Sequence, residues 1–203
     1  MAILVQNNGR LFNLHTKDCT YQMYADEYGV LLHTYYGKKT DGENLADLIY
    51  QADVGFSGNP EEMAGNREYS LDCLPQELPS DGVGDYRESC VALLHENGSM
   101  AADFRFEHYE LFPSSYTVKG MPALYDTEDE KGETLVITMR EKASKVVVRL
   151  FYSVFEEENV ITRAVQVENQ GEYAVVVTKC LSCCLDYQFG EYDLITFAGR
   201  HAM

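Results

Sequence analysis

The sequence contains no tryptophan, and its 16 basic residues are outnumbered by 33 acidic ones. The resulting formal charge of −17 repels phosphate backbones and anionic headgroups, so we expect neither nucleic acid nor a membrane as a partner. No apolar run approaches the ~20 residues that a membrane-spanning helix needs. The first ten residues lack the basic and apolar regions of a signal peptide, so we expect a cytoplasmic protein with reduced cysteines.

The composition is that of a globular protein, with 45% hydrophobic and 24% charged residues. The 203 residues suffice for one sizeable core. We find no internal repeat, low-complexity segment or domain boundary. Residues 1–203 are therefore predicted to form a single β-sandwich domain.

The N-terminal third carries two hairpin signals. Asn8-Gly9 is a favoured two-residue turn between extended segments. A second turn lies at Asp26–Gly29, and the flanking segments are rich in tyrosine and long apolar residues. We therefore predict two antiparallel hairpins, which pair Ile3–Gln6 with Arg10–Thr16 and Thr20–Tyr24 with Val30–Tyr36.

The second half has the same character. Glu96–Ser99 contains Asn97-Gly98 and predicts a hairpin between Arg87–His95 and Met100–Leu111. Short polar separators then divide a series of strand-like runs, as in an antiparallel meander or sandwich. The predicted strands are Thr134–Arg140, Lys145–Phe155, Val160–Glu168 and Tyr173–Leu185.

The segment between these halves is irregular. Glu43–Tyr50 has apolar residues at helical spacing and predicts a short helix. Asn59-Pro60 followed by two glutamates predicts a helical turn with Asn59 as its N-cap and Gly65 as its stop. Asp41–Ser70 is a long loop for a compact domain, and such loops are often functional.

The stretch Leu74–Arg87 organises the chain around it. Its two prolines favour extended backbone, whereas Gly82 and Gly84 permit backbone angles that a side chain would forbid. Asp85 and Arg87 are alternate residues and are predicted to share one face of a strand that begins there.

This stretch, with Pro-Gln-Glu-Leu-Pro at 75–79 and Gly-Val-Gly-Asp-Tyr-Arg at 82–87, resembles the N-terminal domain of glycoside hydrolase family 36 α-galactosidases. Further patches agree in order, at 32–38, 133–135, 160–163 with Asn169, and 193–199. The resemblance implies an all-β fold, an antiparallel β-supersandwich similar to galactose mutarotase with few short helices. In the family this domain precedes a catalytic (β/α)₈ barrel, which this sequence lacks.

The resemblance also implies a function. The parent reaction is hydrolysis of terminal α-D-galactose from oligosaccharides such as raffinose and melibiose. The family's catalytic aspartates lie on the barrel, so we assign no catalytic residue here. The implied partners are the chain's own barrel domain and further copies of itself.

A loop of the N-terminal domain approaches the neighbouring subunit's catalytic pocket in oligomeric relatives. On that basis Asp53, Phe56 and Arg67 are candidate substrate-loop residues. The alternative is that Asp53 and Arg67 form an ion pair across the loop base, worth under ~1 kcal/mol if exposed.

The sequence offers little support for a metal site or for a catalytic histidine. Cys180-x-x-Cys183-Cys184 lacks the second ligand pair of a zinc site, so we predict packed thiols, no metal and no cofactor. His33 is predicted to be a hydrogen-bonded strand histidine. The alternative function is an independent carbohydrate-binding or mutarotase-like domain, which would need exposed aromatic faces, or a histidine and a glutamate in a cleft.

Overall fold

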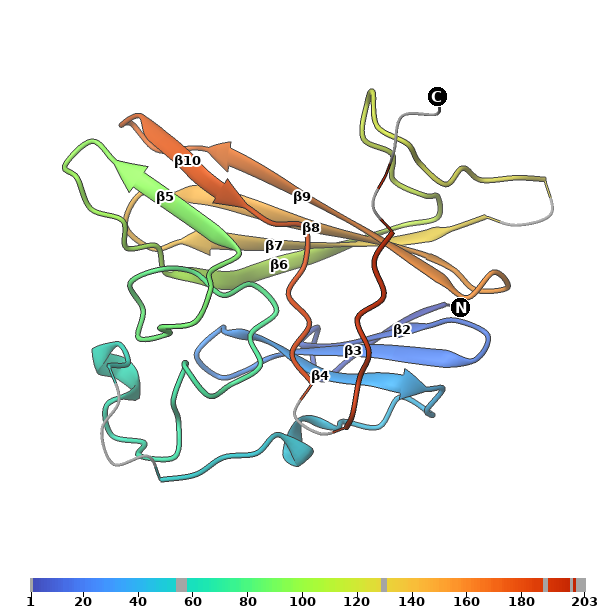
Figure 1. The fold of residues 1–203 in the computed structure, drawn as a ribbon, viewed down its shortest axis with the longest axis horizontal. Coiled ribbons are helices and arrows are strands. Elements are labelled where there is room, and N and C mark those ends of the chain that lie inside the picture. The colour runs from blue at the N-terminus through green and yellow to red at the C-terminus, as the bar shows by residue number, and fades with distance from the viewer. Residues whose placement is uncertain (1, 54–57, 129–130, 188–189, 198, 200–203) are drawn as a thin grey trace.

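The computed structural model describes residues 2–53, 58–128, 131–187, 190–197 and 199. Within them, three antiparallel sheets form the layers seen in Figure 1. The N-terminal sheet consists of β1 (Ile3–Gln6), β2 (Leu11–His15), β3 (Cys19–Ala25) and β4 (Leu31–Lys38). The central sheet consists of β6 (Phe104–Phe112), β7 (Glu133–Glu141), β8 (Val146–Phe155) and β9 (Val160–Asn169). β5 (Val91–His95) and β10 (Val175–Cys180) form a two-stranded sheet.

The prediction of an all-β, antiparallel fold is confirmed. Both N-terminal hairpins form, with Gln6 opposite Leu11 and Ala25 opposite Leu31. Asn8 and Gly9 have φ values of +55° and +81°, the left-handed backbone expected there. The connection is nevertheless longer than the predicted two-residue turn, because pairing ends at Gln6 and Leu11 and leaves residues 7–10 between the strands. β7, β8 and β9 pair consecutively as the predicted meander.

The main hydrophobic core lies between the N-terminal and central sheets. Alternate residues of each strand face inward, because successive side chains of a strand point to opposite sides. The inward set includes Ile3, Phe12, Leu14, Met23 and Leu31 from one sheet and Leu135, Ile137, Val148, Leu150 and Tyr152 from the other.

The predicted hairpin around Glu96–Ser99 is wrong in its pairing. The tight turn exists, since the amide of His95 donates to the carbonyl of Ser99 at 2.9 Å. However, β5 pairs with β10, and β6 pairs with β7. The two strands leave the turn into different sheets, because β5 pairs with the distant β10 whereas β6 pairs with the next strand, β7. For the same reason β10 pairs with β5 rather than with β9, and it ends at Cys180, short of the predicted Leu185.

The predicted helices shrink to single 3₁₀ turns. Ala46–Leu48 replaces the predicted helix over Glu43–Tyr50, and Glu61–Met63 follows Pro60. Asn59 does not cap this turn. Its side chain instead donates to the carbonyl of Tyr69 and accepts from the amide of Leu71 at 3.0 Å, so it crosslinks the loop.

The loop between β4 and β5 encloses a second apolar cluster, which packs on Val30 and Leu32. Met63 at 0% exposure and Tyr69 at 5% anchor the loop in this cluster. The loop is therefore fixed on the N-terminal sheet by packing, although it contains little regular structure. None of the helices in the described part of the chain is long and apolar enough to span a membrane.

The stretch Leu74–Arg87 lies across this cluster, but no strand begins at Asp85 as predicted. Arg87 instead folds back and donates to both carboxylate oxygens of Asp85, at 2.9 and 2.8 Å. Gln76 donates to the same carboxylate at 2.8 Å. The predicted left-handed glycines are confirmed, with φ of +82° at Gly82 and +93° at Gly84.

Gly82→Ala should destabilise the chain by about 1–3 kcal/mol more than Gly98→Ala. Both glycines have φ of +82°, so both substitutions incur the same backbone strain. Only at Gly82 would the new Cβ lie 2.7 Å from backbone and side-chain atoms of Ala101, whereas nothing lies within 4 Å of it at Gly98. Urea unfolding of both variants measures the difference, and equal losses of stability would show that the contact with Ala101 relaxes freely.

Candidate functional site

The predicted substrate-loop residues are only partly brought together. Arg67 Nε donates to Asp53 Oδ2 at 2.9 Å, and the two side chains are 66% and 50% exposed. The alternative ion pair across the loop is therefore observed. Phe56 lies outside the described residues. Because both side chains are at least half exposed, the Asp53–Arg67 pair is accessible at the surface of the loop.

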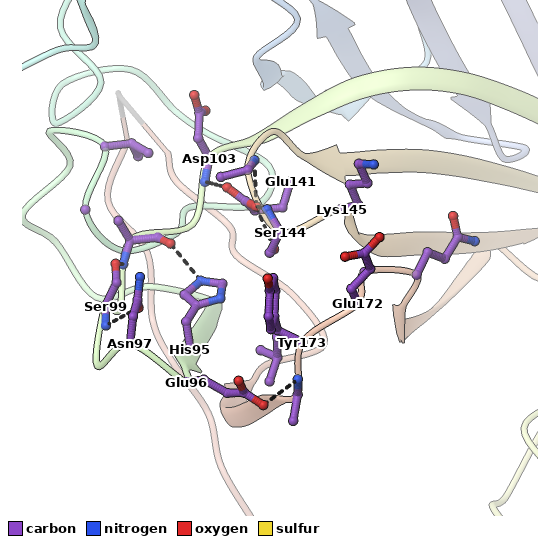
Figure 2. A pocket seen from close by; sticks show the side chains of 18 of the residues that line it. His95, Glu96, Asn97, Ser99, Asp103, Glu141, Ser144, Lys145, Glu172 and Tyr173 are labelled. Carbon is purple, nitrogen blue, oxygen red and sulfur yellow. Dashed lines mark hydrogen bonds between the residues drawn. The ribbon is translucent and has the colours of Figure 1, made fainter.

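A larger concavity lies at the end of the sandwich next to this loop. Three turns border it: residues 95–103 after β5, 141–145 between β7 and β8, and 170–175 between β9 and β10. Gly58 and Pro60 of the loop complete its wall. We call this cavity of about 930 Å³ the turn pocket; Figure 2 shows the side chains around it.

The loop is tied to the turn pocket by charge. Lys142 Nζ donates to Glu62 Oε1 at 2.7 Å, which links the 3₁₀ turn at Glu61–Met63 to the turn between β7 and β8. Arg105 lies 3.6 Å from the same oxygen. The long loop and the pocket therefore form one continuous surface.

Most carboxylates of the turn pocket have structural roles. Glu141 is buried and accepts hydrogen bonds from Ala143 N at 2.9 Å and Ser144 Oγ at 2.6 Å. Burial opposes ionisation of Glu141, but these hydrogen bonds outweigh it and lower its pKa. Asp103 accepts from Arg105 Nη2 at 3.0 Å. These acids hold the turns in place and are not poised for catalysis.

A polar cluster lies inside the main core, and sequence reasoning missed it. Glu77 has no exposed surface, and its carboxylate accepts from Tyr21 Oη at 2.7 Å and from Tyr152 Oη at 2.7 Å. Arg163 Nη1 lies 2.6 Å from Glu77 Oε1, and Nη2 donates to the Glu77 carbonyl at 3.1 Å. The loop stretch, β3, β8 and β9 thus meet at one carboxylate.

Burial dominates the electrostatics of this cluster. It raises the pKa of Glu77, while Arg163 and the two tyrosine hydroxyls act in the opposite direction. Burial, reinforced by Arg163, lowers the pKa of His33 to about 4. The imidazole is therefore neutral near pH 7. Burial therefore shifts the pKa of each group away from its ordinary value, upward for Glu77 and downward for His33.

His33 is on a strand as predicted, but its Nδ1 lacks a hydrogen-bond partner in the described part of the chain. That nitrogen lies 3.7 Å from Glu77 Oε2. The mutarotase-like alternative requires such a histidine and glutamate in an open cleft. Here they are 4% and 0% exposed, so a sugar has no access to them.

The cysteine prediction is corrected in part. Cys184 packs against the core, but Cys180 and Cys183 are exposed, because β10 ends at Cys180 and the following chain leaves the sheet. Among the described residues no group of three metal-ligating side chains converges.

Glu77 and Arg163 both belong to motifs that are visible in the sequence, but nothing in those motifs indicates that the two side chains pair in the core. Both residues lie in the motif patches at 75–79 and 160–163. A glutamate between prolines reads as a surface residue, since Glu is almost never fully buried without a partner. Only its contact with Arg163 in the folded structure distinguishes Glu77 from a surface glutamate.

The whole chain is similar to known proteins. A sequence profile described as the glycosyl hydrolase family 36 N-terminal domain matches residues 29–203. The bifunctional α-galactosidase/sucrose kinase AgaSK of Mediterraneibacter gnavus is 44% identical over 100% of this chain and 22% of its own length. The α-galactosidase Mel36A of Lactobacillus acidophilus is 33% identical over 98% of this chain and 27% of its own.

Solved structures agree. The galactosidase domain of AgaSK matches with a TM-score of 0.85 at 42% identity, over 91% of this chain and 25% of that structure. A doubly substituted variant of the α-galactosidase AgaA of Geobacillus stearothermophilus, solved in complex with raffinose, matches with a TM-score of 0.80 at 32% identity, over 86% of this chain and 24% of that structure. The chain thus spans about a quarter of the length of the relatives it matches, between 22% and 27% for these curated proteins.

Arg163→Met should destabilise the chain by about 3–5 kcal/mol, because it leaves the Glu77 carboxylate buried without its counter-charge. Lys39→Met is the matched control. Lys39 pairs with Glu156 at 3.1 Å, but the two side chains are 40% and 38% exposed, so this loss should be below ~1 kcal/mol. Urea unfolding measures both, and similar losses would contradict the role of Arg163.

Proposed function

This chain belongs to glycoside hydrolase family 36 as its N-terminal domain, and we propose that it is the non-catalytic first portion of a longer α-galactosidase. The observation that carries the proposal is the match over residues 29–203, combined with coverage of only 22–27% of the curated relatives. The proposed reaction is hydrolysis of terminal α-D-galactose from oligosaccharides such as raffinose and melibiose. The proposed location is the cytoplasm.

In this proposal the chain supports the catalytic barrel and the assembly of subunits. An exposed apolar strip supports this role: Leu194, Ile195 and Phe197 are 92%, 75% and 93% exposed. Large exposed apolar patches mark surfaces that another protein surface covers. We assign this strip to contact with the remainder of the same polypeptide, and exposed surface outside the turn pocket to homo-oligomer formation.

The long loop is proposed to contribute to substrate recognition in a neighbouring subunit. Two features support this. Met63 and Tyr69, which flank Arg67 in the sequence, are packed in the second apolar cluster, so the backbone that carries Arg67 is held in place. The Asp53–Arg67 pair presents oriented, partly exposed polar groups that can hydrogen-bond sugar hydroxyls. Phe56 completes the predicted set.

The alternative of an independent mutarotase-like domain is less well supported. His33 and Glu77 are sealed in the core, and the exposed pair His108 and Glu107 does not line the turn pocket. Within that pocket, His95 hydrogen-bonds to the Ala101 carbonyl and Glu96 accepts from the amide of Ala174, so both side chains already have structural partners. Catalysis is therefore assigned to residues outside this chain.

The first test is enzymatic. The purified 203-residue chain should not release a chromophore from an α-galactoside, whereas the product of the uninterrupted reading frame should do so. Turnover by the chain alone, in preparations cleared of host enzyme, would overturn the proposal. So would a reading frame that encodes no βα repeats downstream.

The second test addresses the loop. In the longer enzyme, Asp53→Ala should lower kcat/KM for raffinose more than about tenfold, since a charge-assisted hydrogen bond contributes about 1.5–3 kcal/mol. Arg67→Ala should have a similar effect. The control is Lys17→Ala, which breaks another exposed ion pair, with Glu157 at 3.5 Å, and should leave kcat/KM unchanged. Equal kcat/KM in all three variants would show that the loop pair is only structural.

A further inference from the structure

We propose that the turn pocket is an accessory binding site for a neutral saccharide, with the ring of Tyr173 as its platform. This site lies within the chain itself and is independent of the proposed catalytic activity. Its volume of about 930 Å³ lies at the upper end of the range of ~300–1,000 Å³ that is usual for small-molecule sites. Its walls are turns held by β-strands, so the cavity is formed without a ligand.

Tyr173 is the distinctive group of this pocket. It lines the pocket and is 71% exposed, and Figure 2 shows its side chain between those of His95 and Glu172. A tyrosine presents an apolar ring face and a polar hydroxyl. The C–H face of a pyranose ring matches the first, and its hydroxyls match the second.

The backbone around Tyr173 is fixed from both sides. Asn169 Nδ2 donates to the Tyr173 carbonyl at 2.8 Å. The amide of Ala174 donates to Glu96 Oε1 at 3.1 Å, which ties this turn to the turn after β5. The tyrosine backbone is therefore held before any ligand binds, which reduces the entropic cost of binding.

Several polar side chains around the turn pocket are not fully used in hydrogen bonds within the described residues. In the described part of the chain, the side chains of Lys145 and Glu172, which line the pocket, form no hydrogen bond or ion pair. The Asn97 side chain uses only its oxygen, which accepts from Ser99 N at 2.9 Å. The site thus offers free donors on Lys145 and Asn97 and a free acceptor on Glu172, which is the mixture that sugar hydroxyls require.

Charge favours a neutral ligand. The ammonium of Lys145 and the carboxylate of Glu172 balance each other. The structural acids Glu96, Asp103 and Glu141 line the same cavity, and the chain carries a formal charge of −17, so an anionic ligand is repelled. Among the side chains that the structure describes, a cation finds no convergent set of carboxylates, and Glu141 and Asp103 already have partners.

The test is an NMR titration of the 203-residue chain with raffinose, followed through backbone amide shifts. Saturable shifts should appear in residues 95–99 and 170–175. Tyr173→Ala should weaken binding at least about tenfold, while Tyr173→Phe, which keeps the ring, should stay within about twofold. The matched control is Tyr125→Ala, at a residue 67% exposed on a different loop, which should bind as the unaltered chain does.

Glycerol serves as the control ligand, since it has hydroxyls but no ring. The proposal is overturned if raffinose produces no saturable shifts, if glycerol reproduces them, or if Tyr173→Ala leaves them unchanged. A second readout is raffinose soaked into crystals of the longer polypeptide. A sugar ring stacked on Tyr173 supports the proposal, and a pocket without sugar while the catalytic site is filled overturns it.

Discussion

A carboxylate with no contact to water is the constraint around which this fold is arranged. Desolvation of Glu77 costs several kcal/mol, and it is tolerated because Arg163, Tyr21 and Tyr152 all reach it. These partners come from β9, β3 and β8, which belong to two different sheets. The cluster therefore fixes how the N-terminal and central sheets lie against each other, and it fixes both to the loop that carries Glu77.

The position of that loop determines the surface where function is proposed. From Glu77 the chain passes through Gly82, whose close approach to Ala101 places the turn after β5. The same region packs on the second apolar cluster, which also anchors the segment that presents Asp53 and Arg67. Buried ion pairs are often no more stabilising than apolar contacts of the same size. We interpret this one as specifying position, since it aligns the loop and the turn pocket at one end of the sandwich.

Turn motifs in the sequence correctly predicted the hairpins whose two strands are consecutive in the chain. Asn8-Gly9 and the polar separator at 156–159 predicted hairpins that form, because the strand partners there are neighbours in the chain. The separator at 169–172 did not, since β10 pairs with β5 and not with β9. Asn97-Gly98 produced a correct turn and a wrong hairpin, since β5 takes its partner from the distant β10. Asn59 had the sequence pattern of an N-cap, but its side chain satisfies two backbone groups of the loop instead. At both Asn97-Gly98 and Asn59, contacts with distant parts of the chain determined the structure in place of the local sequence preference.

The family resemblance supplied Asp53, Phe56 and Arg67 as substrate-loop residues, and that role stays a prediction. The ion pair between Asp53 and Arg67 is the alternative that the residues themselves indicated, and it is observed. The turn pocket was not predicted, because its three turns are adjacent only after two sheets have assembled. The burial of Glu77 was not predicted either, since its guanidinium partner lies 86 residues away in the sequence.

The pairing of β5 with β10 also has a consequence during synthesis of the protein. Val91 leaves the ribosome long before Cys180, its partner in the sheet. At ~5–20 residues per second, the edge of β5 waits on the order of 10 s for the strand that covers it. Throughout that interval its unpaired backbone groups are available to other nascent chains, and an uncovered edge of this kind is a site of aggregation. Chaperone occupancy during translation should therefore concentrate on this part of the chain.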